Sequence, residues 1–403
     1  MDKSNSKFPL WPQWDKEDVD IVTGVIKSGK WWAGSPANHC GEHFWEFQKE
    51  FAEFCEVKHA FAVTNGTHAL EIALQALDIG LGNEVIVPDM TFFASASCVV
   101  SVNAVPIFAE IDRETFNIDD KKIETLITER TKAIITVHLG GMPAHMGRIC
   151  EIAKKHDLFV IEDSAHAQGS RYMGKRMGTW GDIGTFSFQA SKVLTSGEGG
   201  AVITNNDDLA HKIYSIIDCG RKEGKRSYDH FTYGSNYRLS ELCCALLRSQ
   251  LKKFPKQHAQ RNRNAQYLRK RLNEIEGIMC QKREKHVQEC ANYVFPFVFE
   301  PDKFGNISKQ QFYDYLNNNG IPTDDTYPPL HGLKCFKNIK LRKGIDYSSA
   351  NWGGKKSDDV NFPVTSEVSS RLIELPQELL LSDQSQLDYV VETIKNLQQS
   401  FIS

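Results

Sequence analysis

Three places along the chain carry residue types that could bind or transform a small charged molecule. The first runs from Thr64 to Leu70 and follows the apolar run HAFAV, where Gly66 permits a tight turn and Thr67 can begin a helix. Backbone N–H groups, a hydroxyl and the helix dipole would then converge on an anion such as phosphate. The alternative is an ordinary helix cap, because Gly-Thr before a helix is common.

The other two places offer a carboxylate and an amine. Asp163 ends the apolar run LFVIED, and Lys192 lies between the runs GTFSF and GAVITN rather than on the polar face of a helix. A carboxylate at the end of a buried strand needs a partner, because an unpaired buried charge is costly. That partner is either a structural cation or a ligand, and Lys192 is either a solvated side chain or a functional amine.

Together, a phosphate cradle, a carboxylate and a lysine at the strand ends of one sheet suit pyridoxal 5'-phosphate. This cofactor needs a phosphate site, an acid that keeps its pyridine nitrogen protonated, and a lysine that forms the imine and moves protons. Nucleotide motifs are missing: Gly197-Glu198-Gly199-Gly200 lacks the last glycine of Gly-x-Gly-x-x-Gly, and no Gly-Lys-Ser/Thr occurs. The ten cysteines include no Cys-x-x-Cys pair and no zinc-finger histidine spacing, so we expect no metal site.

The elements that position these residues follow from the hydrophobic pattern. From His59 onward, short strand-like runs such as EVIVP, AIITVHL and LFVIED alternate with helix-like runs. This alternation predicts an α/β domain with a mostly parallel sheet covered on both faces, in which ligands bind beyond the carboxyl ends of the strands. GTFSF and GAVITN predict two short strands joined by the loop that carries Lys192.

Two helices are predicted before this sheet. The first lies behind Asp15, a possible cap, and ends at Gly29. The second has one phenylalanine face, which indicates core packing rather than a ligand-binding stripe. That face consists of Phe44, Phe47, Phe51 and Phe54.

The C-terminal part of the chain lacks the regular alternation of strand-like and helix-like runs. Helical segments dominate from Asp207 to about Glu276, and the charged run PKQHAQRNRNAQYLRKRLNEIEG indicates a solvated helix face rather than nucleic-acid binding. After Gly277, YVFPFVFE predicts a strand, SKQQFYDYLNNNG a helix ended by Gly320, and DQSQLDYVVETIKNLQQSFI a final helix. We therefore predict a large domain with its N-terminal helix over residues 1–254 and a small α+β domain over 255–403.

Composition limits the partners and the compartment. The 48 Lys and Arg residues nearly balance the 51 Asp and Glu residues, so we expect no nucleic-acid or membrane partner. The first twenty residues contain no apolar signal region, and the most apolar later stretch, 84–109, is interrupted by prolines and polar residues. We expect a cytoplasmic protein with reduced thiols.

In these features the sequence resembles the DegT/DnrJ/EryC1/StrS aminotransferases, the sugar aminotransferases of fold type I. The resemblance covers nearly the whole chain and implies a homodimer in which each active site lies at the subunit interface. The matching blocks are SGKWWAGSP, NGTHALEIALQALDIGLGNEVIVPDMTF, TKAIITVHLGGMPAHM, VIEDSAHAQGS, GDIGTFSFQASKVLTSGEGGAVITNN, YGSNYRLSELCCALL and VSSRLIELP.

The resemblance assigns roles to individual residues. It makes Lys192 the Schiff-base lysine and Asp163 the partner of the pyridine nitrogen. It also implies a phosphate site to which the other subunit contributes one residue. The residues of that site are Gly66, Thr67, Ser187 and, from the other subunit, Asn236.

Further residues match positions around the cofactor ring and the substrate. Phe92 matches the aromatic that stacks on the pyridine ring, and His166 matches a position, often Gln, that lies against the cofactor. From the residues alone, these two are equally a core phenylalanine and a satisfied buried histidine. Gln189, Arg238 and His331 are expected on the substrate side.

Gln189 also bears on the substrate, because many family members that act on nucleotide-linked sugars have His three residues before the lysine. The run SFQASKVLTSGEGGA is more similar to the branch that aminates keto-inositols or makes aminohydroxybenzoate in antibiotic pathways. The resemblance implies transfer of an amino group from L-glutamate or L-glutamine to a keto-cyclitol or keto-sugar. The alternatives are a nucleotide-linked keto-sugar as acceptor, and a regulatory protein that binds the cofactor or an amino-sugar without turnover.

Overall fold

The computed structural model describes residues 7–33, 40–223, 228–337, 344–347, 349–351 and 361–402. Residues 34–36 of the SGKWWAGSP block lie outside the described residues.

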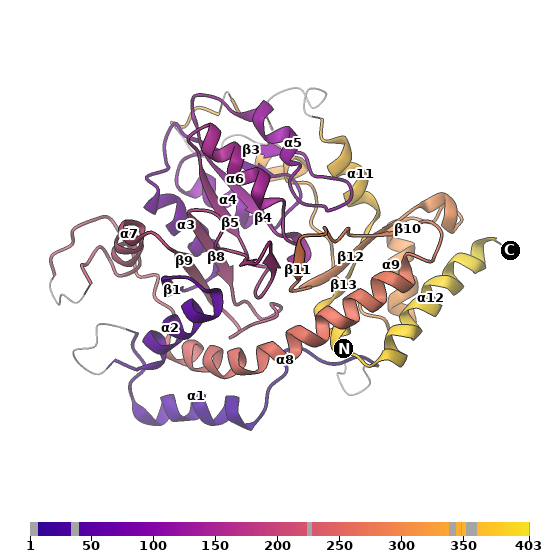
Figure 1. Ribbon diagram of the computed structural model, residues 1–403, viewed down its shortest axis with the longest axis horizontal. Helices are drawn as coiled ribbons and strands as arrows, with labels where there is room; N and C mark the ends of the chain where they lie inside the picture. The colour runs from indigo at the N-terminus through magenta and orange to yellow at the C-terminus, as the bar shows by residue number, and fades with distance from the viewer. Residues whose placement is uncertain are drawn as a thin grey trace.

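A seven-stranded mixed sheet forms the centre of the molecule, in the order β1-β9-β8-β5-β4-β2-β3 (Figure 1). Strands β8, β5, β4, β2 and β3 run parallel, whereas β9 pairs antiparallel with both β8 and β1. The sheet confirms the predicted α/β class and the two strands around the lysine loop. The strands are β1 His59–Val63, β2 Glu84–Pro88, β3 Val105–Ala109, β4 Thr131–Val137, β5 Phe159–Asp163, β8 Ile183–Ser187 and β9 Gly200–Thr204.

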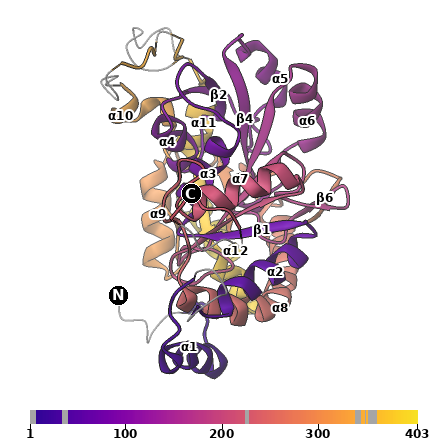
Figure 2. The same ribbon diagram turned by 90° about the vertical axis from the view of Figure 1, so that its left-hand side faces the viewer.

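Helices cover both faces of this sheet, as parallel crossovers require. Figure 2 shows α4 and α6 on opposite sides of β4. The buried strands β2, β3 and β8 expose no residue to solvent, which explains their continuous apolar runs. The covering helices are α3 Gly66–Ala76, α4 Ala94–Ser101, α5 Asp120–Ile123, α6 Met146–Lys155 and α7 Asp207–Ile217.

The two predicted N-terminal helices are confirmed as α1, Lys16–Ser28, and α2, His43–Cys55. Asp15 caps α1 with a capping box, and Gly29 ends it in the left-handed conformation. Three of the four phenylalanines of α2 are buried, and the fourth packs against the same core, so the core interpretation is confirmed. Both helices contact the long helix α8, Glu241–Leu272.

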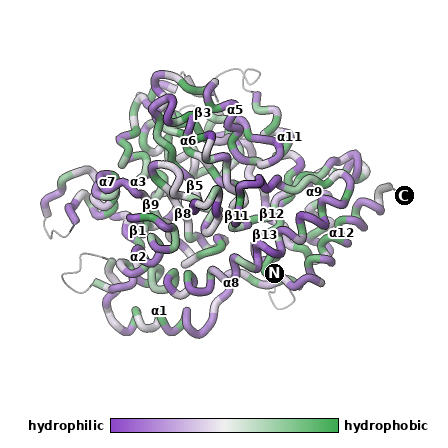
Figure 3. Tube along the Cα trace, in the orientation of Figure 1, coloured by the Kyte–Doolittle hydropathy of each residue, from purple (hydrophilic) through white to green (hydrophobic). Residues whose placement is uncertain are grey.

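The C-terminal part forms a second, three-stranded sheet in the order β10-β12-β13. The predicted strand and two helices are confirmed as β12, α9 and α12, and Ser308 caps the N-terminus of α9. In Figure 3, hydrophilic and hydrophobic residues alternate along α8 and α12, as expected for helices with one face in a core. The elements are β10 Ile278–Cys280, β12 Val294–Phe299, β13 Leu372–Pro376, α9 Lys309–Asn318, α10 Lys334–Lys337, α11 Pro363–Arg371 and α12 Gln384–Ile402.

A small third sheet joins the two parts of the chain. Strand β11, Val287–Glu289, pairs with β6, Arg171–Tyr172, which pairs with β7, Lys175–Arg176. Short 3₁₀ helices complete the described elements. They are η2 Glu124–Leu126, η3 Leu139–Gly141, η4 Pro301–Phe304, η5 Leu330–Gly332 and η7 Gln377–Leu381.

Helices dominate the region from Asp207 to about Glu276, as predicted, and these helices are α7 and α8. The described residues between them form turns and isolated bridges. The expected boundary at 254/255 falls inside α8, which contains Pro255, and Phe8 from the N-terminus packs in the C-terminal core. The division into domains therefore stays a prediction.

Candidate active site

One cavity of about 680 Å³ opens where β1, β5 and β8 end. All the predicted site residues except Asn236, Arg238 and His331 line it. These residues come from the ends of four strands, because Phe92 follows β2 while the others follow or end β1, β5 and β8. The topology therefore brings together the three places that the sequence singled out, at the sheet edge where parallel strands place ligand sites.

The phosphate cradle is the start of α3. This helix begins at Gly66, and the side chain of its cap Asn65 accepts a hydrogen bond of 2.8 Å from the backbone N–H of His68. The N–H groups of Gly66 and Thr67 have no acceptor within the helix, as in any first helical turn. A Cβ atom added to Gly66 would lie 2.8 Å from the Cβ of Ser187. Only glycine therefore lets the helix start approach Ser187 so closely.

Asp163, the last residue of β5, is buried at the cavity wall. Its Oδ2 accepts a 2.7 Å hydrogen bond from the hydroxyl of Ser95, and its Oδ1 accepts a 3.2 Å bond from the backbone N–H of Ala165. Burial raises the pKa of this carboxyl, while the Ser95 hydroxyl opposes the rise. Among the described residues no cation forms an ion pair with Asp163, so its partners there are hydrogen-bond donors alone.

Glu162 precedes Asp163 in β5, so the two side chains point to opposite faces of the sheet and have different surroundings. Glu162 is fully buried and accepts hydrogen bonds from the backbone N–H groups of Gly178, Trp180 and Gly181, at 2.6 to 2.8 Å. Glu162 therefore fixes the loop before β8. Asp163, one residue later, lines the cavity instead.

Lys192 is buried, and its backbone N–H donates a 2.8 Å hydrogen bond to the carbonyl of Gln189. Its Nζ lies 4.0 Å from the ring centroid of Tyr293. Burial lowers the pKa of Lys192 to about 8, although the negative charges of Asp163 and Glu374 favour the ammonium form. The amine of Lys192 therefore loses its proton at lower pH than an exposed lysine would, which favours its action as a nucleophile or proton acceptor.

Aromatic side chains form the rest of the cavity wall. The ring of His166 lies 4.2 Å from the ring of Tyr293, and its Nε2 is 3.3 Å from the hydroxyl of Tyr327. Burial lowers the pKa of His166 well below its usual range, so the imidazole is neutral. Its Nδ1 has no partner in the described structure. Phe92 is 53% exposed and free to cover a ligand.

Several residues of the site escaped the sequence analysis. Ser95 does not line the cavity but donates a hydrogen bond to Asp163 from behind it. Its position three residues after Phe92 was the only signal in the sequence. Tyr293 and Tyr327 belong to the C-terminal part of the chain, where nothing in their local sequence indicates a site. Their packing against His166 depends on tertiary structure alone.

Three predicted residues do not reach this cavity from the same chain. Asn236 is exposed and forms a backbone bridge with Asp218. Arg238 forms an ion pair with Asp218. The Nδ1 of His331 lies 2.6 Å from a carboxylate oxygen of the buried Asp89. The roles expected for these three residues stay predictions.

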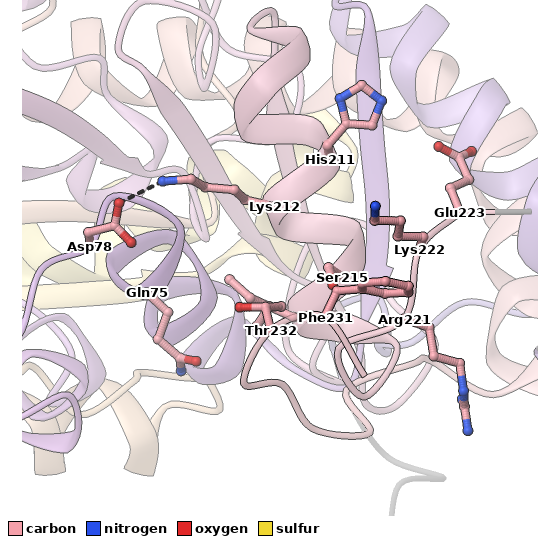
Figure 4. A pocket seen from close by; sticks show the side chains of 11 residues that line it. Gln75, Asp78, His211, Lys212, Ser215, Arg221, Lys222, Glu223, Phe231 and Thr232 are labelled. Carbon is pink, nitrogen blue, oxygen red and sulfur yellow. Dashed lines mark hydrogen bonds and ion pairs between the residues drawn. The ribbon is translucent and has the colours of Figure 1, made fainter. Parts of the chain in front are cut away.

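A second cavity, of about 690 Å³, lies between α3, α7 and the loop after α7 (Figure 4). It contains none of the predicted residues. Lys212 is bound to Asp78 at 2.6 Å, and the side chains of Arg221 and Lys222 point in different directions. These cations do not converge on one point.

Three structural findings concern other classes of site. In the part of the chain that the structure describes, no three His, Cys, Asp or Glu residues are grouped as metal ligands would be. Over the same residues, every helix is too short or too polar to cross a membrane. All ten cysteines are free thiols.

Comparisons with known proteins agree with this geometry. The model of the DegT/DnrJ/EryC1/StrS aminotransferase family matches residues 12–395. The chain is 33% identical to L-glutamine:2-deoxy-scyllo-inosose aminotransferase from Streptoalloteichus tenebrarius, covering 96% of this chain and 93% of the relative. It is 39% identical to GDP-perosamine synthase from Caulobacter vibrioides, covering 81% and 86%. The crystal structure of 3-amino-5-hydroxybenzoic acid synthase superimposes with a TM-score of 0.87 at 30% identity, covering 97% and 98%.

Proposed function

Because the chain belongs to the DegT/DnrJ/EryC1/StrS aminotransferase family, which is pyridoxal-phosphate-dependent, we propose which amino group it transfers and to what. The donor is L-glutamine or L-glutamate, and the acceptor is the keto carbon of an uncharged keto-cyclitol or keto-sugar. The observation that carries this proposal is the charge of the cavity: Lys192 is the only Lys or Arg among its described lining residues.

The residues present fit pyridoxal phosphate. The free N–H groups at the start of α3 and the hydroxyl of Ser187 would hold the phosphate, where the close approach of Gly66 leaves no room for a side chain. The buried carboxylate of Asp163, which has no cation from the described protein, would face the protonated ring nitrogen. Phe92 and His166 would contact the faces of the ring.

When bound, the cofactor supplies the carbonyl group that takes up the amino group and the ring that accepts electrons. The neutral amine of Lys192 accepts the proton from the carbon that carries the donor's amino group, and it returns a proton when the acceptor is aminated. Asp163 keeps its negative charge once a cation lies against it. The ring of Tyr293, whose centroid lies 4.0 Å from Nζ, covers one side of the amine.

The charge of the cavity favours a neutral acceptor. A nucleotide-linked sugar carries two phosphate groups, and desolvating them without cations would be costly. Gln189 occupies the cavity as an uncharged residue, and its side-chain oxygen accepts hydrogen bonds of 2.8 and 2.7 Å from the backbone N–H and the hydroxyl of Ser191. The relative that acts on 2-deoxy-scyllo-inosose supports the same choice through its name.

A nucleotide-linked acceptor is the second candidate, because one relative at 39% identity is a GDP-perosamine synthase. This alternative requires cations from another subunit to reach the cavity.

We also propose a homodimer with shared active sites. Asn236 is exposed on a segment that follows the loop after α7, and large apolar side chains of the N-terminal region are exposed. Val19, Ile26 and Trp31 are 50%, 53% and 58% exposed, as expected of surfaces that a second copy covers.

We further propose that the protein is located in the cytoplasm. The ten free cysteines fit this location.

The test is a two-step reaction followed through the absorbance of the cofactor. The loaded protein is first treated with L-glutamine or L-glutamate until the absorbance changes, and the free donor is removed. 2-Deoxy-scyllo-inosose or a nucleotide-linked keto-sugar is then added. We expect the keto-inositol to restore the starting spectrum.

The competing substrate gives the control. UDP, dTDP and GDP at millimolar concentration should leave the second step unaffected, since the cavity offers them no cation pair. If only a nucleotide-linked sugar restored the starting spectrum, or if one of these nucleotides inhibited competitively at micromolar concentration, the acceptor would be a nucleotide-linked sugar.

A further inference from the structure

Arg261, on α8, is buried in surroundings that do not stabilise its charge with hydrogen bonds. Its side chain is fully buried, and its Nε, Nη1 and Nη2 atoms have no hydrogen-bond partner among the described residues. Its guanidinium carbon lies 4.9 Å from the centre of the Trp11 ring. A buried cation without hydrogen bonds costs free energy, and an apolar side chain of similar size is often at least as stable.

Trp11 connects this cation to the loop of the reactive lysine. Its indole N–H donates a 2.9 Å hydrogen bond to the carbonyl oxygen of Ala190, two residues before Lys192. The same turn is closed by the 2.8 Å hydrogen bond between the backbone N–H of Lys192 and the carbonyl of Gln189. Three segments far apart in sequence thus meet at one turn.

The segment that carries Trp11 is held along α8 on both sides. Before it, Phe8 is buried in the C-terminal core with Leu268. After it, the carbonyl of Gln13 accepts a 3.1 Å hydrogen bond from the side chain of Gln250. With both flanks fixed, Trp11 transmits the position of α8 to the lysine turn rather than following that turn.

We propose that Trp11 and Arg261 are positioning residues for Lys192. Arg261 holds the plane of the indole ring by a cation–π contact, and the indole N–H holds the carbonyl of Ala190. The turn then presents the Lys192 amine to the cavity in one orientation. The proposal rests on the role of Lys192 as the reactive amine and is independent of the acceptor.

The test compares substitutions that remove one interaction each. Trp11→Phe removes the N–H donor but keeps a ring, Arg261→Met removes the charge but keeps an unbranched chain, and Arg261→Lys restores a cation. Trp14→Phe is the matched control, because Trp14 lies in the same segment and is 73% exposed. If Arg261→Met fails to fold, Trp11→Phe alone carries the test.

The main readout needs no catalysis. Lys192 in the cofactor-free protein is methylated with formaldehyde and cyanoborohydride, and the rate is measured by peptide mass spectrometry against the exposed Lys154. We expect Trp11→Phe and Arg261→Met to raise the relative rate at least fivefold and to lower kcat about tenfold, with the unfolding temperature unchanged or higher. Arg261→Lys should restore part of the effect.

Two results would overturn the proposal. One is an unchanged labelling rate and kcat in both variants. The other is a change in labelling that appears only together with a lower unfolding temperature, which would show a merely structural role. Because labelling is measured on the cofactor-free protein, a failure of the proposed acceptor leaves this test intact.

Discussion

At the scale of single residues, the balance of charge around Lys192 decides its chemistry. Burial favours the neutral amine, whereas the negative charges of Asp163 and Glu374 favour the ammonium ion. Glu374 is itself buried, and desolvation raises its pKa to about 8. Burial outweighs the carboxylates at Lys192, so its pKa falls to about 8 rather than rising.

This balance predicts a pH dependence in the cofactor-free protein. The neutral fraction of Lys192 increases as pH rises, so its rate of methylation should reach half its maximum near pH 8. Asp163→Asn removes a charge that raises the lysine pKa, and the midpoint should therefore move to lower pH. A midpoint that rises in this variant would contradict the assignment.

Lys192→Ala should abolish turnover without unfolding the protein, because no other described lysine lines the cavity. The absorbance of the covalently attached cofactor should disappear as well. The check is borohydride reduction followed by peptide mapping. A reducible cofactor adduct at another lysine would show that Lys192 is not the reactive amine.

Asp163→Asn should keep cofactor binding but slow proton abstraction by about a hundredfold, or about 2.7 kcal/mol of barrier, because the charge that faces the ring nitrogen is lost.

Ser95→Ala removes one hydrogen bond to the Asp163 carboxylate and should slow proton abstraction about tenfold, roughly 1.4 kcal/mol of barrier. Single-turnover kinetics with L-glutamine measure both effects. Near-normal rates in Asp163→Asn would make Asp163 a structural carboxylate.

At the scale of elements, the approach of α3 to β8 sets the phosphate site. Gly66→Ala would place a Cβ atom 2.8 Å from the Cβ of Ser187, so the helix start must move away. We expect cofactor affinity to fall at least tenfold, as measured by equilibrium dialysis. Gly147→Ala in α6 is the control, because its Cβ atom would meet nothing within 4 Å and should leave affinity unchanged. Equal affinity in the two variants would contradict this cradle.

The elements also show where sequence reasoning succeeds. Asp15 and Gly29 delimit α1 because capping is local, and the lysine loop was found because its flanking strands have clear apolar runs. The continuation of α8 through Pro255 was not predicted, since a proline usually ends or kinks a helix.

The candidate site also contains residues that the sequence predicts and residues that it does not. Gly66 and Lys192 follow strands and Asp163 ends one, so sheet topology alone brings them to one edge. Tyr293 and Tyr327 arrive from the C-terminal part through packing that no local pattern encodes. Asn236 was expected at the site through family resemblance, because a contact between subunits leaves no periodic signal in one chain.

At the scale of the whole molecule, a shared active site predicts complementation between inactive chains. Lys192→Ala and Asn236→Ala chains are unfolded and reassembled in equal amounts, so that about half of the dimers are hybrids. Each hybrid then contains one site with both native residues, and about one quarter of wild-type activity should return. A mixture as inactive as its parents, with hybrids shown to have formed, would place Asn236 outside the neighbouring site.

The most direct test of the central claim follows the nitrogen atom itself. The loaded wild-type protein is given L-glutamine labelled with ¹⁵N in its α-amino group, together with 2-deoxy-scyllo-inosose, and the products are analysed by mass spectrometry. We predict that the label appears in an amino-cyclitol and that Lys192→Ala abolishes this transfer. Label that stays in the glutamine, or that reaches only a nucleotide-linked sugar supplied in a parallel reaction, would contradict the account.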